Sequence, residues 1–362
     1  MKKRRLEFLG ASWLFWVGAI AVYAVVQVLF STNVITDYMK TVIQLGCVMA
    51  IVSLGLNLIY GFNGQFSLGQ WGFYAIGAYA SADITYRYAA KVSIPLDLGF
   101  ATFDAGNIAI FLVAIAFGAL LAGVIAYLFG LPVLKMGGDY FGIATLGFTI
   151  VVKVMADNTD TILPFPEMKG ARGMVGIPRL TTWFWSFFLL VLCIIILRNI
   201  LHSSTGRAIV SVRENEIAAK AMGIDTVKYK TLSFVIGGIY AGLAGGIYAH
   251  LYAFLHPSLF HFIKSFDPMI IVVFGGLGSI TGTVVAAFAW ALSLEGLRII
   301  LPSGAEAWRY IIYPVALLLI MLLRPQGLLG GVEWGFLKPI QWPRRKFDTG
   351  APKVETAGQE AV

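Results

Sequence analysis

Long apolar runs separated by short polar segments make up most of the chain. A helix needs about 20 apolar residues to cross the hydrocarbon core of a bilayer, and most of these runs reach or approach that length. Three of them, 66–83, 266–280 and 310–323, are short enough to be re-entrant or tilted segments. The pattern predicts an all-α polytopic membrane protein of about 8–10 transmembrane helices with broken or re-entrant segments. The runs are residues 11–30, 41–60, 66–83, 108–134, 140–155, 180–197, 231–255, 266–280, 281–301 and 310–323.

The composition agrees with a membrane protein. The 362 residues are 58% hydrophobic and 13% charged, with a mean hydropathy of +0.80, which one soluble core could not bury. The net charge of +8 resides mainly in loops between apolar runs, as the positive-inside bias predicts, so nucleic acid is not an expected partner. We expect 11–30 to be a retained first helix and both termini to be cytoplasmic. We place a transmembrane domain at 1–330 and a poorly ordered cytoplasmic tail at 331–362.

The longest polar interruption is the segment 198–230, which lies between two apolar runs. Ser211 and Glu214 have the spacing of a capping box, and Gly223 stands where a helix ends on a left-handed residue. Between them the sequence predicts a helix over 212–222, which is too short and too polar to cross a bilayer. We therefore expect a short helix at the cytoplasmic membrane surface.

Two pairs of runs are joined by tight, glycine-rich breaks at 61–70 and 274–282. Each break has a glycine followed three residues later by a serine, Gly64 with Ser67 and Gly276 with Ser279, and an internal repeat is one open explanation. Polar groups beside a helix start could meet a substrate carboxylate, or the breaks could serve only close packing. The candidate pathway or gate residues are Asn63, Gly64, Gln65, Ser67, Gln70, Gly275, Gly276, Gly278 and Ser279.

No catalytic or metal-binding constellation is visible in the sequence. Phosphate-loop, zinc-protease and nucleophile-elbow motifs are absent, so we expect no catalytic residues, no metal and no cofactor on this chain. Cys47 and Cys193 both lie in apolar runs, where a disulfide framework is not indicated. Intramembrane titratable residues are scarce, which disfavours a proton-driven carrier, whereas broken segments leave a sodium-driven one open. If the chain moves a solute and has no coupling-ion or nucleotide site of its own, a partner protein or the solute gradient must supply the driving force.

The segment ENEIAAKAMG, residues 214–223, resembles the cytoplasmic Glu-Ala-Ala loop of ABC importer permeases. Further stretches resemble the branched-chain amino acid type, LivM-like, and occur in matching order between about residues 45 and 329. They are GQFSLGQWGFYAIG at 64–77, GDYFGIATLG at 138–147, the loop 206–230, FGGLGSITGT at 274–283 and LRPQGL at 323–328.

The resemblance implies a non-catalytic permease subunit of an ATP-driven importer in a prokaryotic-type cytoplasmic (inner) membrane. Its partners would be a second permease, two ATP-binding subunits that hold ATP and Mg, and an extracytoplasmic solute-binding protein. Branched-chain amino acids are the implied substrates. The residues implied to couple to an ATPase are Arg213, Glu214, Glu216, Ala218, Ala219 and Gly223.

One segment departs from that family. Residues 169–173, KGARG, replace the usual Gly-Gly-Pro/Ser-Asn/Asp-Gly run ahead of Gly-Ile-Pro at 176–178, in a loop expected to be extracytoplasmic. The departure leaves urea or a short amide as an alternative substrate. A stand-alone secondary carrier is the alternative from another class.

Overall fold

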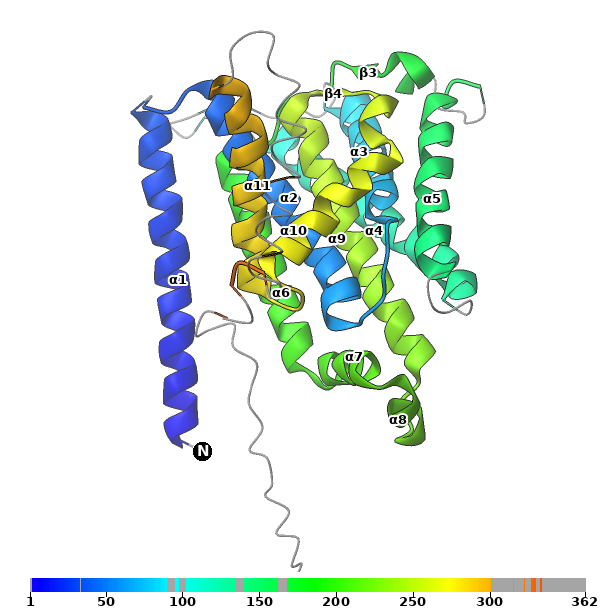
Figure 1. Ribbon diagram of the computed structural model, residues 1–362. Coiled ribbons are helices and arrows are strands. Elements are labelled where there is room, and N and C mark those ends of the chain that lie inside the picture. The colour runs from blue at the N-terminus through cyan, green and yellow to red at the C-terminus, as the bar shows by residue number, and fades with distance from the viewer. Residues whose placement is uncertain are drawn as a thin grey trace, which may run out of the picture.

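The computed structural model describes residues 2–32, 34–89, 95–97, 102–134, 140–161 and 168–300, together with 315, 322, 327–329 and 333. Helices dominate this part of the chain (Figure 1), and each apolar run up to residue 300 falls on one. The run 310–323 lies almost entirely outside the described residues. The long helices are α1 (Lys2–Ser31), α2 (Asp37–Leu56), α3 (Gln70–Tyr88), α4 (Ala105–Val133), α5 (Tyr140–Asp157), α6 (Trp183–His202), α9 (Thr226–Tyr252) and α11 (Ile280–Ile300).

The shorter elements join these helices or lie at the ends of the bundle. A π-helical turn, η1 (Asn57–Phe62), continues α2, and α10 (Phe266–Gly275) precedes α11. Antiparallel pairs join β1 (Pro95–Asp97) to β2 (Thr102–Asp104) and β3 (Met174–Val175) to β4 (Phe254–Leu255). The remaining helices are α7 (Ser204–Glu214), α8 (Glu216–Ala221) and the 3₁₀ turns η3 (Gly170–Arg172), η4 (Pro257–Phe260) and η5 (Phe262–Ser265).

Five helices of the described chain are long and apolar enough to cross a membrane. They are Asp37–Phe62, Gly106–Val133, Tyr140–Asp157, Trp183–His202 and Thr226–Tyr252, and shorter apolar helices cover Phe15–Ser31 and Ile280–Leu294. At 10 residues, α10 is about 15 Å long and cannot span a bilayer by itself. The prediction of a polytopic all-α protein with a broken segment is confirmed.

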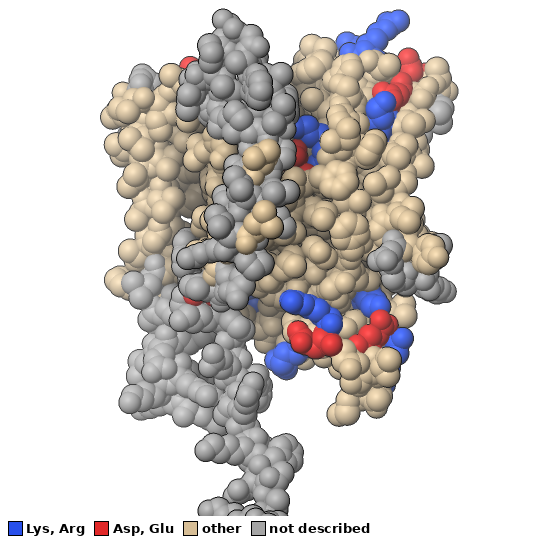
Figure 2. Space-filling view, in the orientation of Figure 1, with Lys and Arg blue, Asp and Glu red and all other residues tan. Residues whose placement is uncertain are grey.

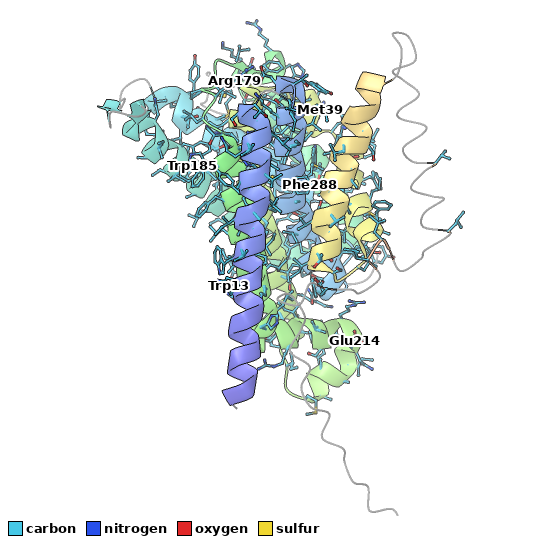
Figure 3. The ribbon with its side chains drawn as sticks, turned by 90° about the vertical axis from the view of Figure 1, so that its left-hand side faces the viewer. Trp13, Met39, Arg179, Trp185, Glu214 and Phe288 are labelled. Atoms are coloured by element: carbon cyan, nitrogen blue, oxygen red, sulfur yellow. The ribbon has the colours of Figure 1, made fainter. Side chains whose placement is uncertain are left out.

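Close backbone packing holds the centre of the bundle together. A Cβ atom at Gly46 of α2 would lie 2.7 Å from the ring of Phe288 on α11, which Figure 3 shows between these two helices. A Cβ at Gly77 of α3 would collide with the backbone of Gly242 on α9. Since membrane helices gain little from the hydrophobic effect, such small-residue contacts supply much of their association.

The two ends of the bundle differ (Figure 1). The start of α1 lies at the same end as α7 and α8, and we name this the α7–α8 end. The pair of β3 and β4 lies at the opposite end, the β3–β4 end. Charged side chains gather over α7 and α8 in Figure 2 and again in the upper part of that face, whereas the surface between is largely uncharged.

Candidate functional site

The polar segment 198–230 folds into two short helices, α7 and α8. Ser203 caps α7 by accepting a hydrogen bond from the Gly206 N–H, and Asn215 caps α8 by accepting one from the Ala218 N–H at 2.9 Å. The predicted capping box at Ser211 and Glu214 is therefore wrong. The Ser211 hydroxyl instead donates to the Ala208 carbonyl within α7. Asn215 separates the helices because its extended backbone and short amide side chain suit an N-cap.

The end of α8 follows the prediction. Gly223 has a φ of +81°, a left-handed conformation that costs glycine little. The Ile224 N–H donates to the Ala219 carbonyl at 3.0 Å, as in a Schellman motif. Gly223 therefore ends the surface helix and turns the chain toward α9.

Glu216 attaches α8 to the start of α9. One carboxylate oxygen accepts a hydrogen bond from Thr226 at 3.1 Å, and the other is 2.7 Å from the Lys230 ammonium. Lys220 also contacts this carboxylate at 3.1 Å. The Lys230 hydrogen bond is the main cause that lowers the pKa of Glu216 to about 2, so the ion pairs persist at neutral pH.

The residues of α8 that we expect to couple to an ATPase differ in exposure. Ala219 is only 5% exposed, because other residues of this chain cover it. Ala218 is exposed, and the neighbouring Ile217 and Met222 are each 82% exposed. Sequence reasoning missed these two side chains, although large apolar residues in a polar loop were an available signal. They form the exposed apolar pair of α8.

Arg213, which we predicted to face an ATPase, turns toward the first break. Its guanidinium Nη1 donates a short hydrogen bond to the Gly61 carbonyl. A Cβ at Gly64 would lie 3.1 Å from the Arg213 Cγ, and one at Gly278 would lie 3.2 Å from Nη1. The last turn of α7 therefore contacts both glycine-rich breaks through one side chain.

Asn57 joins η1, the turn that leads into the first break, to the second break. Its amide nitrogen donates to the Ser279 carbonyl and to the Thr283 hydroxyl, both at 2.9 Å, and its amide oxygen accepts from the Gly278 N–H at 2.9 Å. The side chain is fully buried. Asn57 was missed, although a polar amide inside an apolar run marks an intramembrane hydrogen-bonding site.

The shared glycine–serine pattern corresponds to shared local geometry. Gly64 and Gly276 both have positive φ, +75° and +110°. The Ser67 hydroxyl accepts from the Gly69 N–H at 3.3 Å, and the Ser279 hydroxyl accepts from the Gly282 N–H at 2.9 Å. In both breaks the serine hydroxyl therefore binds an N–H close to the start of the following helix, where donors lack helical partners.

Gln70 is the last residue of the first break and the first residue of α3. It is 1% exposed, and neither its amide nitrogen nor its amide oxygen has a hydrogen-bond partner among the described residues. Asn63 donates to the Gln65 side chain at 3.0 Å. A cavity of about 390 Å³ lies between this break and the helices α7 and α8, beside the contact that Arg213 makes. Its lining includes Asn63, Gln65, Arg213, Glu214, Glu216 and Lys230.

A distant part of the chain holds the second break. Leu328 donates its N–H to the Phe274 carbonyl at 2.7 Å. The Glu333 carboxylate accepts from the N–H groups of Ile280 and Thr281 at 2.7 and 3.2 Å, so it caps α11. Glu333 belongs to the segment predicted to be poorly ordered, and the rest of that segment lies outside the described residues.

A bundle of apolar helices with two joined breaks, tied to a polar helix pair at one end, is the architecture of a membrane permease. The sequence matches the family "Branched-chain amino acid transport system / permease component" over residues 38–322. The chain belongs to this family, and it is the multi-pass, non-catalytic permease component of a branched-chain amino acid ABC transport system. Permeases of this family carry no cofactor.

Curated relatives agree with this family. The chain is 30% identical to the high-affinity branched-chain amino acid transport system permease protein LivM of Escherichia coli K12, over 85% of this chain and 71% of that protein. It is 26% identical to the permease protein LivH of the same strain, over 80% of this chain and 94% of that protein. The chain is 25% identical to the probable branched-chain amino acid transport permease protein LivM of Methanocaldococcus jannaschii, over 77% of this chain and 89% of that protein. No solved structure matches.

Proposed function

We propose that α7 and α8 dock an ATP-binding subunit and carry its movement to the two breaks. The observation that carries the proposal is the contact of Arg213 with Gly61, which connects the surface helices directly to a broken intramembrane segment. Asn57 extends the connection to the second break. A displacement of α7 would therefore act on both breaks, since Gly61, which Arg213 bonds, and Asn57, which bonds the second break, lie in the same π-helical turn.

The docking surface would be the exposed apolar pair of α8, Ile217 and Met222. Ile217 lies on the six-residue helix and Met222 is its C-cap residue, and two large side chains that are each 82% exposed suit insertion into a groove of the ATP-binding subunit. Glu216 would keep α8 fixed to α9 while the ATP-binding subunit moves α8, because Glu216 bonds Thr226 and Lys230 of α9. Ala219, which is buried, would pack α8 against the rest of this chain and would not contact the ATP-binding subunit.

The orientation follows from the same docking. The α7–α8 end would face the cytoplasm, and the start of α1 lies at that end (Figure 1). The β3–β4 end, which carries the unusual segment 169–173, would receive an extracytoplasmic solute-binding protein. A second permease of the LivH or LivM kind would complete the membrane part, together with two ATP-binding subunits. ATP hydrolysis on them would move branched-chain amino acids inward.

Two measurements on the assembled transporter test this function. Replacing the apolar pair of α8 by Ile217→Ser and Met222→Ser should remove most of the ATP-binding subunit that co-purifies with the permease. Ile263→Ser is the matched control, because Ile263 is 58% exposed but lies in η5 rather than on α8. Unchanged co-purification in the double variant would contradict the docking surface.

Uptake into proteoliposomes tests the energy source and the substrate. The complete system should accumulate L-leucine only when ATP is supplied. Gradient-driven uptake by this chain alone would support a secondary carrier instead. ATP-driven uptake of urea without uptake of leucine would support the alternative substrate.

A further inference from the structure

A second cavity lies toward the β3–β4 end of the bundle. Its volume is about 440 Å³, within the range of sites that hold small molecules. Residues of α2, α3, α9, α10 and α11 line it, together with Arg179 before α6 and Lys264 of η5. Figure 3 shows Arg179 at the end of the bundle opposite Glu214, so this cavity is separate from the one beneath α7 and α8.

Charges of both signs line this cavity. The Lys264 ammonium is 3.3 Å from the Asp267 carboxylate, whose side chain is only 15% exposed. Arg179 adds a second positive charge to the lining, and no ion pair involving it occurs among the described residues. One acidic and two basic side chains therefore meet a cavity whose other walls are largely aromatic and aliphatic. Charges in such surroundings are costly unless they are paired.

The wall of the cavity contains two buried polar atoms without partners. Tyr74 is 1% exposed and Trp290 is 6% exposed, and neither the tyrosine hydroxyl nor the indole N–H has a hydrogen-bond partner among the described residues. By contrast, the indole N–H of Trp71 donates to the Leu259 carbonyl at 2.9 Å. Because most buried polar atoms in proteins are bonded, the Tyr74 and Trp290 groups point to a polar ligand.

Aliphatic side chains complete the lining. Val42 and Leu45 come from α2, Leu251 from α9 and Leu294 from α11, and each is at least nine-tenths buried. They offer apolar surface close to charges of both signs. This combination suits a molecule with one positive group, one negative group and a short hydrocarbon side chain.

We propose that this cavity binds an aliphatic α-amino acid in its zwitterionic form. Lys264 and Arg179 take the carboxylate, Asp267 takes the ammonium group, and the side chain packs against Val42, Leu45, Leu251 and Leu294. The Trp290 N–H and the Tyr74 hydroxyl supply further hydrogen bonds to the polar end. The zwitterion would exchange the Lys264–Asp267 pair for two pairs with the ligand, which an uncharged molecule such as urea cannot do.

This inference rests on the proposed function, because it assigns the amino acid a site within the permease. The test measures ATP-driven uptake of L-leucine by the complete transporter in proteoliposomes, with KM and maximal rate determined separately. Asp267→Asn should weaken apparent leucine affinity about tenfold, since a hydrogen bond to a charged group is lost. Trp290→Phe, which removes only the N–H donor and ring bulk, should weaken it about threefold.

Asp83→Asn is the matched control. Asp83 is 14% exposed and pairs with Arg87 at 2.9 Å, but it does not line the cavity, so KM should stay unchanged. Direct binding of radiolabelled leucine to the permease–ATPase complex without the binding protein gives a second readout. In this binding assay, 4-methylpentanoate lacks the ammonium group of leucine and 3-methylbutylamine lacks its carboxylate. Each should displace radiolabelled leucine at least tenfold more weakly than unlabelled leucine does.

The outcomes separate the two proposals. Absence of ATP-driven leucine uptake in the unaltered transporter would overturn the proposed function. Normal uptake with unchanged KM in both Asp267→Asn and Trp290→Phe would overturn the proposed amino acid site in this cavity and leave the proposed function standing. If Asp267→Asn fails to assemble with the ATPase, Trp290→Phe and Lys264→Met decide, and unchanged KM in both again contradicts the site. Equal competition by the single-charge analogues would exclude recognition of a zwitterion.

Discussion

The two glycine-rich breaks resemble each other locally but are held by different parts of the chain. Both carry a positive-φ glycine followed by a serine whose hydroxyl accepts a backbone N–H. Arg213 of α7 lies close to both breaks but donates its hydrogen bond to the first, 61–70, at Gly61. The second break, 274–282, is also held by Glu333, which caps the helix that follows it. The difference indicates that the first break is placed to receive movement from the surface helices, whereas the second is also anchored from the C-terminal part of the chain.

Asn57 provides the largest test of this comparison, because it bonds the second break from η1, the turn that leads into the first break. Asn57→Leu should remove three hydrogen bonds and leave the Gly278 N–H without its acceptor, which costs about 1–3 kcal/mol for that group alone. We expect a lower Tm of the detergent-purified transporter. We also expect at least tenfold slower uptake, because the second break would no longer follow movement of the first, and an activation barrier raised by about 1.4 kcal/mol slows a step about tenfold.

Ser53→Ala is a suitable control for Asn57→Leu. Ser53 lies one turn earlier on α2, is fully buried, and its hydroxyl has no partner among the described residues. Its removal should leave Tm and uptake close to those of the unaltered protein. Equal behaviour of the two variants would show that Asn57 does not join the breaks.

Glu333→Gln should loosen the second break and leave the first unchanged. The amide cannot replace a carboxylate that accepts two helix-start N–H groups, and the loss is worth about 1 kcal/mol. Hydrogen exchange should speed up at the amides of residues 280 and 281 and stay constant at 61–70. Glu214→Gln is the control, since Glu214 is exposed on α7. Faster exchange at 61–70 as well would contradict an effect of Glu333 that is confined to the second break.

Glu216 provides a smaller, pH-dependent test of the surface helices. Its pKa is lowered from 4.5 to about 2, so the stabilisation is fully present above about pH 4.5 and is lost as pH falls toward 2. Hydrogen exchange of α8 amides should therefore be constant from pH 7 to pH 5, after correction for intrinsic rates, and increase below pH 4.5. Glu216→Gln should show the loosened α8 at all these values. An acid-sensitive α8 in the variant would contradict the role of this carboxylate.

The sequence predicted the helices and breaks because both depend on local patterns. Apolar runs marked the membrane helices, and the glycine–serine spacing marked both breaks. The contacts that connect them are not local: Arg213 and Gly61 are 152 residues apart, and Asn57 and Gly278 are 221 apart. No residue pattern within one window encodes such a pairing, so the contact of Arg213 with the first break was not predicted.

The misplacement of Ser211 has a different cause. One helix was predicted over 212–222, but Asn215 divides the segment into α7 and α8. A serine can cap a helix or donate to a carbonyl inside one, and the choice depends on where the preceding helix begins. Here Ser203 already caps α7, so Ser211 lies in its interior.

The central claim is that Arg213 transmits movement from the ATPase to the breaks, and the number of leucine molecules moved per ATP hydrolysed tests it most directly. Arg213→Gln keeps an amide donor but removes the guanidinium, whereas Arg207→Gln alters another exposed arginine of the same helix. We predict that Arg213→Gln lowers the ratio about tenfold while ATP hydrolysis continues, and that Arg207→Gln leaves it unchanged. An unchanged ratio in Arg213→Gln would contradict the account.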